Sequence, residues 1–295
     1  MDILECCTLC PRNCRVNRYK TIGGCGANSK LKIAYYSLHE WEEPIISGTN
    51  GSGTVFFSNC NLKCIFCQNN DISEKGYGKE TTIDRLRKIY LELQDKGAHN
   101  INLVTPTHYV PQIMESLDIK GKSLNIPIVY NTSSYENVET IKMLDGLVDV
   151  YLADLKYYDS SLGEKYSHCS NYFEVASKAI DEMYKQVGSP VIENDLIKKG
   201  LVVRILILPS EVEDAKKIVK YLYDKYKDNI YISLMNQYTP MKEFKDYPNL
   251  NNKLDDNDYN EVIDYAEDLG VENAFIQVGE TADTSFIPKF NCDNI

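Results

Sequence analysis

Short apolar segments alternate with stretches of helical period from residue 54 onward. The segments that predict strands are 55–57, 101–104, 126–130, 148–152, 202–208 and 230–234. Between them, apolar spacing near 3.6 residues predicts helices over 83–93, 110–117, 138–144, 172–183 and 212–226. Strands that alternate with helices indicate parallel βαβ units. Six such strands predict an α/β fold, an open or partial barrel short of the eight strands of a closed one.

Other segments flank this alternating region. Residues 1–30 contain cysteines 6, 7, 10, 14 and 25 without a strand or helical period. Residues 31–53 are expected to be a linker loop, because two acids precede Pro44 and a Gly/Ser/Thr/Asn run follows. The barrel is expected over 54–240, with 187–200 as a surface loop. Residues 241–295 are expected to pack on it as an extension, with a helix at 255–269 and a late strand or arm at 274–278.

Three cysteines, Cys60, Cys64 and Cys67, follow the first predicted strand in a C-x3-C-x2-C run. Three thiolates can bind three irons of a cubane cluster, whereas most electron-transfer clusters take four cysteines. The fourth iron is then open to a substrate or cofactor, as one position of a catalytic zinc site is. A structural zinc site usually needs a second cysteine pair, and no clean pair follows nearby. The spacing therefore predicts chemistry at an iron–sulfur cluster.

The N-terminal cysteines predict a second metal centre. A segment without a core of its own needs something to offset its ordering cost, and a metal is the natural candidate. Cys7, Cys10, Cys14 and Cys25 supply four thiolates, which fit either a closed iron–sulfur cluster or tetrahedral zinc. We favour the cluster over zinc. Reduced cysteines without metal are the alternative.

Composition excludes several classes of partner. The net charge of −11 argues against a nucleic-acid partner. No apolar run approaches the roughly 18 residues of a membrane span, and MDILECCTLC has no secretion signal. Ten cysteines in such a chain predict metal ligands and reduced thiols in the cytoplasm, and not a disulfide framework.

The cysteine loop, with Phe66 as its aromatic residue, resembles the radical S-adenosylmethionine (radical SAM) superfamily. The run GSGTVFFSNCNLKCIFCQNNDIS is similar to pyruvate formate-lyase activating enzymes, and more closely to relatives that share the CPRNC, NLVTPTH and FIPKF segments. The resemblance covers nearly the whole chain. It implies a partial (β/α)6 TIM-like barrel and a [4Fe-4S] cluster on Cys60, Cys64 and Cys67. Backbone near Phe66 is expected to meet the adenine of S-adenosylmethionine.

The resemblance also implies the reaction. The amino and carboxylate groups of S-adenosylmethionine chelate the fourth iron, and one electron cleaves the sulfonium to methionine and a 5′-deoxyadenosyl radical, which abstracts hydrogen. Such an enzyme is an anaerobic oxidoreductase that draws its electron from reduced flavodoxin or ferredoxin. Its substrate is a peptide, a protein or a small molecule.

Further candidates lie at strand ends, where βα folds gather functional groups. In the activating enzymes a Gly-Gly-Glu-Pro run follows the second barrel strand and contacts the methionyl amine. This chain has Thr105, Pro106, Thr107 and His108 there. Thr105 and Thr107 are predicted to receive the amine. His108 is expected either to contact the substrate as a proton donor or to be a helix-entry histidine.

The next strand ends supply charged and amide groups. Asn131 is predicted to contact ribose or carboxylate, or to cap a helix. Asp154 and Lys156 share one side of a strand. The resemblance places them near cofactor and substrate, and a buried ion pair is the alternative. Arg204 stands in an apolar run and needs a partner: the cofactor's carboxylate, by the resemblance, or a neighbouring strand's acid. Gln237 is predicted to contact adenine or ribose.

The sequence is compatible with three functions. The first is a glycyl-radical enzyme activase, the second is a radical enzyme that acts on a peptide or small molecule, and the third is a non-catalytic iron–sulfur or zinc scaffold or sensor. The N-terminal cysteines favour the second, because simple activases need only one cluster. The open cluster corner, Asp154, Lys156 and Arg204 argue against the third.

Overall fold

The structure is a computed structural model, and it describes residues 2–277, 288, 290, 292 and 295. Its strands are β1 Lys32–His39, β2 Ser52–Phe57, β3 Lys79–Glu80, β4 Ile101–Val104, β5 Ile128–Thr132, β6 Val150–Asp154, β7 Val191–Glu193, β8 Leu196–Leu206, β9 Tyr231–Met235 and β10 Ala274–Ile276. Its helices are α1 Pro44–Ser47, α2 Asn70–Ser73, α3 Ile83–Asp95, α4 Val110–Ser116, α5 Val138–Lys142, α6 Ser160–Ser167, α7 Tyr172–Val187, α8 Val212–Tyr226 and α9 Asp256–Leu269.

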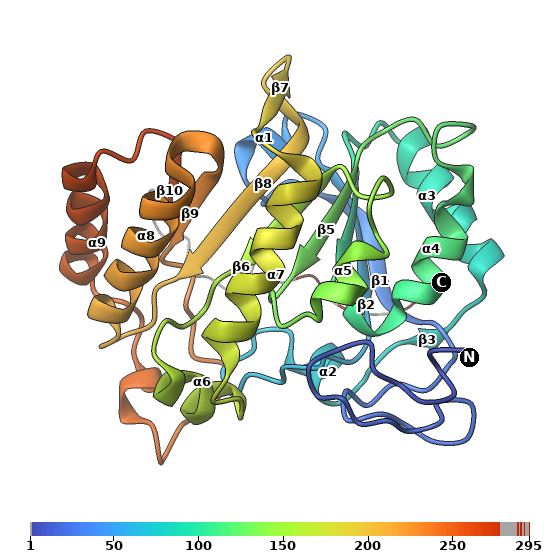
Figure 1. Ribbon diagram of the computed structural model, residues 1–295, viewed down its shortest axis with the longest axis horizontal. Coiled ribbons are helices and arrows are strands. Elements are labelled where there is room, and N and C mark those ends of the chain that lie inside the picture. The colour runs from blue at the N-terminus through green and yellow to red at the C-terminus, as the bar shows by residue number, and fades with distance from the viewer. Residues whose placement is uncertain (1, 278–287, 289, 291, 293–294) are drawn as a thin grey trace.

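The strands form one curved sheet in the order β10-β9-β8-β6-β5-β4-β2-β1-β3, with β7 paired to β8 (Figure 1). The run from β2 to β10 is parallel, and β1 is antiparallel to both β2 and β3. All residues of β2, β4 and β5 are buried, as expected of parallel strands covered on both faces. The six predicted strands are therefore present, in chain order, as an incomplete barrel.

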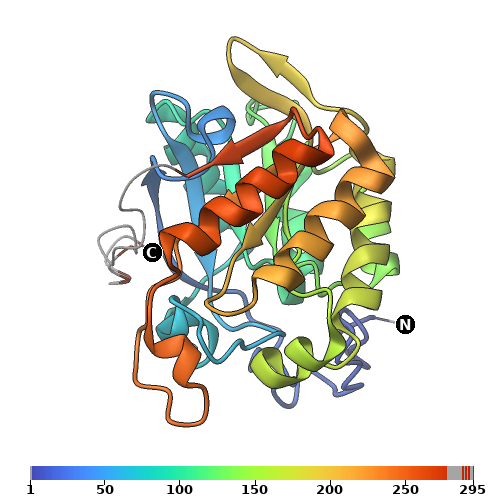
Figure 2. The same cartoon turned by 90° about the vertical axis from the view of Figure 1, so that its left-hand side faces the viewer.

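The helices cover the outside of this sheet because each buries one apolar stripe. In α3, Leu86, Ile89, Tyr90 and Leu93 are buried at helical spacing. The helix begins where the Thr82 side chain accepts a hydrogen bond from the backbone N–H of Arg85, at 3.1 Å. Helices α8 and α9 lie side by side over one end of the sheet (Figure 2). No helix of residues 2–277 is long and apolar enough to cross a lipid bilayer.

Two loop expectations were wrong. Residues 31–53 contain β1 and α1, so they are part of the fold and not a linker. Residues 187–200 contain a hairpin of β7 and β8, joined by Asn194 and Asp195 at φ 51° and 62°. Positive φ at both turn positions is the mark of the tight hairpin turn that Asn and Asp favour. Helix α6 was not predicted at all.

The parallel strands bring their carboxyl ends to one side of the molecule. The loop after β2, helices α2 and α6, and the N-terminal segment of residues 2–30 gather there (Figure 1). That segment contains no helix or strand, as the sequence predicts. Most of the expected C-terminal arm, GETADTSFIPKF, lies outside the described residues, although Phe290 packs on Phe56 with ring centroids 5.4 Å apart.

Candidate active site

The cysteine loop leaves β2 in a constrained backbone conformation. Asn59 and Lys63 have positive φ, 76° and 57°, which few residues other than glycine adopt. The N–H of Cys67 donates to the carbonyl of Cys64 at 3.1 Å, so the loop folds back on itself. Cys60, Cys64 and Cys67 are all free and half-buried. The loop thus holds three thiols near one another without a disulfide.

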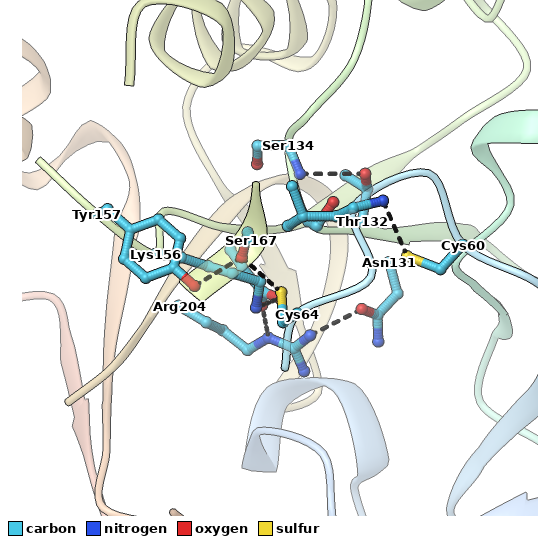
Figure 3. A network of polar contacts seen from close by, with 12 residues as sticks. Cys60, Cys64, Asn131, Thr132, Ser134, Lys156, Tyr157, Ser167 and Arg204 are labelled. Carbon is cyan, nitrogen blue, oxygen red and sulfur yellow. Dashed lines mark hydrogen bonds and ion pairs between the residues drawn. The ribbon is translucent and has the colours of Figure 1, made fainter. Parts of the chain in front are cut away.

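Each sulfur of this loop accepts a hydrogen bond. Ser167 donates to Cys64 Sγ at 3.0 Å (Figure 3), Ser73 to Cys67 Sγ at 3.3 Å, and the Leu62 N–H to Cys60 Sγ at 3.4 Å. Burial raises the pKa of Cys60 to about 12, so the thiol is neutral until a metal displaces its proton. Donors aimed at the sulfurs stabilise thiolates and tune the potential of an iron–sulfur cluster.

A cavity of about 440 Å³ opens beside the three cysteines. Its volume is typical of a small-molecule or cofactor site. Most side chains predicted for the site line it: Cys60, Cys64, Cys67, Phe66, Thr105, Asn131, Asp154, Lys156, Arg204 and Gln237. Parallel strands β4, β5, β6 and β8 and the end of β9 therefore bring together residues that are far apart in the sequence.

Asp154 and Arg204 are cross-strand neighbours on β6 and β8. Arg204 Nε donates to Asp154 Oδ1 at 2.8 Å, and Lys156 Nζ donates to Asp154 Oδ2 at 2.7 Å. Burial alone would raise the pKa of Asp154, but Arg204 and Lys156 together lower it below its ordinary value. The carboxylate is therefore ionised, and both ion pairs that the sequence allowed as alternatives are formed, at the wall of the cavity.

Arg204 also reaches the amide of Asn131 and a residue that sequence analysis missed. Its Nη2 donates to Asn131 Oδ1 at 2.7 Å (Figure 3), and its Nη1 donates to Glu42 Oε2 at 3.1 Å. Glu42 comes from the segment between β1 and α1, and its Oε1 accepts from Asn102 Nδ2 at 2.9 Å. The Arg204 guanidinium thus joins β5, β6 and the segment between β1 and α1.

The adjacent Glu43 lines the same cavity and is 8% exposed. Burial raises the pKa of both Glu42 and Glu43, against the opposing effect of Arg204. Glu43 Oε2 is buried without a hydrogen-bond partner. The only sequence signal for this pair was two neighbouring acids between Trp41 and Pro44, in a segment expected to be a loop.

The residues after β4 separate into two groups. Thr105, at φ 57°, lines the cavity, and its N–H donates to the carbonyl of Asn131 at 2.9 Å. Thr107 lies away from the cavity, is 1% exposed and donates to Glu136 Oε1 at 2.6 Å. Thr132 donates to the same oxygen at 2.7 Å. Thr107 is therefore placed to hold a buried carboxyl, not to receive the amine as predicted.

Glu136 is a third acid that sequence analysis missed, after Glu42 and Glu43. It is 1% exposed, and burial raises its pKa to about 7, against the opposing effect of donors such as Thr107. Its other oxygen, Oε2, has no hydrogen-bond partner. Because Glu136 follows β5 and Thr107 follows β4, the contact ties together two neighbouring strand ends beneath the cavity.

His108 is a buried helix-entry residue. It is 1% exposed, and its Nε2 lies 2.7 Å from the carbonyl oxygen of Ser58, which can only accept. The imidazole is therefore neutral with its proton on Nε2. Burial lowers its pKa to about 3, although the Ser58 carbonyl raises it and Arg18 lowers it further. This placement agrees with the alternative that His108 is a helix-entry histidine, and His108 does not line the cavity.

The depressed pKa of His108 predicts a loss of stability in acid. An unfolded histidine has a pKa of about 6.5. Between pH 6.5 and about 3 the unfolded chain therefore binds more protons, so this contribution is complete above 6.5 and is lost as the pH falls. We expect the urea midpoint of the wild type to fall more between about pH 7 and 5 than that of His108→Gln. An equal fall in both proteins would contradict the buried neutral imidazole.

The N-terminal cysteines lie at the same end of the molecule. Cys7, Cys10 and Cys25 are buried and Cys14 is half-buried. The sulfurs of Cys14 and Cys25 each lie 3.5 Å from the point where a Cβ on Gly23 would stand, so the two approach each other. Burial raises the pKa of Cys10 to about 12. Among the described residues, no group of three or more Cys, His, Asp or Glu side chains is arranged to hold a single metal ion.

The donor set fits the cluster that the sequence predicts. Three thiols from one loop face a cavity with no fourth cysteine in its lining. Hydrogen-bond donors already point at the sulfurs, and the adjoining walls carry the Asp154, Lys156 and Arg204 charges. A three-thiolate cluster with an open corner and a charged, cofactor-sized ligand would both be accommodated there.

Comparison with known proteins agrees with this geometry. The family model described as the radical SAM superfamily matches residues 54–222. A protein of Methanocaldococcus jannaschii described as uncharacterized is 30% identical over 285 residues, covering 92% of this chain and 77% of that protein.

Solved structures with a similar fold share little sequence. Streptococcus suis SuiB bound to its precursor peptide SuiA has a TM-score of 0.54 at 16% identity, covering 75% of this chain and 47% of SuiB. SuiB bound to S-adenosylmethionine has a TM-score of 0.52 at 17% identity, covering 75% of this chain and 48% of SuiB. HydG, a maturase of the [FeFe]-hydrogenase, has a TM-score of 0.50 at 16% identity, covering 73% of this chain and 48% of HydG. The chain spans about half the length of these structures.

These likenesses confirm the predicted α/β class and partial TIM-like barrel. The family match covers most of the strand that precedes the cysteine loop, the loop itself, and the residues Asp154, Lys156 and Arg204. Because this match spans more than half of the chain, the protein is a member of the radical SAM superfamily.

Proposed function

We propose that this protein binds a [4Fe-4S] cluster on Cys60, Cys64 and Cys67 and cleaves S-adenosylmethionine reductively. The observation that supports this most is the set of three hydrogen-bonded thiols at the wall of a cavity of about 440 Å³. When bound, the cluster and S-adenosylmethionine supply one-electron cleavage of the sulfonium to methionine and a 5′-deoxyadenosyl radical, which takes a hydrogen atom from the substrate. The electron comes from a reduced flavodoxin or ferredoxin.

The chain's own residues bind and orient the cofactor in this proposal. Arg204 and Lys156 are two of the cations that line the cavity, beside Lys63, and they are placed to attract the carboxylate of S-adenosylmethionine. Phe66 packs edge-on against Tyr166 and Tyr238, at 6.1 Å each, and provides an apolar wall for adenine. Thr105, Asn131 and Gln237 offer polar groups for the amine and ribose.

We propose a peptide or small molecule as the substrate, in preference to a glycyl-radical enzyme. The additional cysteines Cys7, Cys10, Cys14 and Cys25 favour this choice, because simple activases need one cluster only. We propose that these four thiols bind a second iron–sulfur cluster, with zinc as the alternative. The described cysteines are all free, which is consistent with the reducing cytoplasm, where we place the protein.

An anaerobic reconstitution tests both metal centres. The protein is loaded with iron and sulfide, its iron is counted, and 5′-deoxyadenosine is measured after addition of dithionite and S-adenosylmethionine. Two cubane clusters predict about eight irons per chain together with 5′-deoxyadenosine. About four irons with activity would assign zinc, or no metal, to the N-terminal site. A fully loaded protein that cleaves nothing would contradict the enzyme and favour a scaffold or sensor.

A further inference from the structure

The side chain of Arg12 joins two parts of the fold that surround Cys64. Its Nε donates to the carbonyl of Asn61 at 2.9 Å, and its Nη2 donates to that of Leu62 at 3.2 Å. Its Nη1 and Nη2 also donate to the carbonyls of His168 and Ser167, at 2.8 and 3.0 Å. A single guanidinium therefore satisfies four backbone carbonyls from two segments that are about a hundred residues apart in the chain.

Both segments contact the predicted cluster ligands directly. Asn61 and Leu62 lie between Cys60 and Cys64 in the loop. Ser167 ends α6, and its hydroxyl donates to Cys64 Sγ at 3.0 Å (Figure 3). The carbonyls at a helix C-terminus lack intrahelical partners and carry partial negative charge, which a cation satisfies. Arg12 therefore fixes the distance between the loop that carries the thiols and the helix end that donates to one of them.

Arg12 itself is held between two of the N-terminal cysteines. It stands in the turn from Cys10 to Cys14, which the N–H of Asn13 closes by donating to the Cys10 carbonyl at 3.0 Å. Two side chains of the barrel anchor the preceding residues. Asn137 donates to the carbonyl of Thr8 and Thr140 to that of Leu9, both at 2.7 Å.

Two backbone hydrogen bonds pair the two sides of this turn: the Cys7 N–H donates to the Val16 carbonyl at 3.0 Å, and the Arg15 N–H donates to the Cys7 carbonyl at 2.9 Å. Residues 2–30 contain no helix or strand, so these bonds do not continue into a longer backbone ladder. Their buried side chains include Cys7, Cys10 and Cys25. A metal bound to these thiols would supply the cross-links that a small core cannot, as it does in other small metal-bound segments. Because Arg12 stands between Cys10 and Cys14, such cross-links would hold both ends of the turn that carries it.

We propose that the metal centre of Cys7, Cys10, Cys14 and Cys25 is a clamp on the cluster loop, and that Arg12 is the positioning residue through which it acts. The inference rests on the proposed function, since it takes Cys60, Cys64 and Cys67 as cluster ligands. In this inference the N-terminal metal centre has a structural task, and no electron has to pass between it and the cluster on the loop. It also explains why an arginine stands here, because the single nitrogen of a lysine cannot reach four carbonyls on two segments.

Hydrogen exchange gives a direct readout of the clamp. The N–H of Ile65, in the cluster loop, donates to the carbonyl of Tyr166 at 2.9 Å and reports whether loop and helix stay together. In the reconstituted protein we expect Arg12→Lys to speed exchange of this amide about tenfold or more, because carbonyls of the loop and of the helix end lose their shared donor. Arg15→Lys is the matched control, since Arg15 lies in the same segment and is exposed. A second readout is the change that S-adenosylmethionine causes in the electron paramagnetic resonance spectrum of the reduced cluster, which Arg12→Lys should alter.

A double-mutant cycle tests the link to the second centre. If the metal acts through Arg12, then Arg12→Lys adds little to the exchange rate in a Cys14→Ala background. Additive effects, or an Arg12→Lys protein that matches Arg15→Lys in both readouts, would overturn the inference and leave the proposed function intact. Wild-type protein that loads no iron on the loop would overturn the proposed function and this inference together.

Discussion

Cys64→Ala abolishes 5′-deoxyadenosine formation to the level of protein-free controls; this is the largest effect that we expect from any single substitution. The variant leaves two thiols in the loop and removes the acceptor of the Ser167 hydrogen bond. A cubane cluster held by two cysteines lacks the ligand that fixes its orientation toward the cavity. The measurement is an anaerobic assay with dithionite and S-adenosylmethionine, together with an iron count.

Matched cysteine variants separate this effect from a general loss of thiols. Cys6 is exposed and was not assigned to either centre, so Cys6→Ala should keep full iron content and activity. Cys10→Ala should retain part of the cleavage, because the loop ligands remain in place. Wild-type rates in both Cys64→Ala and Cys10→Ala would show that the cluster assignment is incorrect.

Arg204→Met should strongly destabilise the fold. The Arg204 side chain is 13% exposed and pairs with Glu42 and Asp154, whose side chains are 10% and 19% exposed. Removing the cation leaves Glu42 buried without it, while Asp154 keeps Lys156. Breaking a buried pair in this way costs about 3–5 kcal/mol. Chemical denaturation of the anaerobic protein measures the free energy of unfolding.

A surface pair and a compensating substitution are the controls for Arg204→Met. Arg85 pairs with Glu92 at partly exposed positions, so Arg85→Met should cost less than about 1 kcal/mol. In a Glu42→Gln background, Arg204→Met should cost clearly less than it does alone, because the unpaired charge has been removed. Equal costs in both backgrounds would mean that Glu42 and Arg204 are not energetically coupled.

The sequence predicted the parallel core because its strands carry the strongest local signal. The segment 101–104 is buried along its whole length and was predicted with its observed bounds. Burial on both faces removes the polar alternation that makes an edge strand ambiguous. Strand β1 lies between β2 and the two-residue edge strand β3. Its sequence, KIAYYSLH, mixes buried and half-exposed positions, and its antiparallel partner β2 follows a helix of four residues. Its pairing is decided by the neighbouring β2 and not by its own pattern.

The sequence predicted those residues of the site that lie at the carboxyl ends of the parallel strands, because these ends meet at one edge of the sheet. Asp154 ends β6, Lys156 follows it and Arg204 lies near the end of β8. The rule that the ends of parallel strands meet placed these residues together. Glu42 was missed because it reaches the site from the opposite direction, after an antiparallel strand. Thr107 was assigned to the wrong task because its partner, Glu136, is contributed by the next loop. Contacts between loops carry no periodic signal.

The participation of β1 and the N-terminal segment in the site has a consequence for how the protein can be divided. The region shared with the superfamily model begins at residue 54. A fragment that starts there would keep the three loop cysteines and Arg204. It would lose Glu42, Arg12 and strand β1, which pairs with β2. The part of the chain that builds the site is therefore larger than the region that the superfamily model matches, and we expect a functional fragment to need the residues before 54.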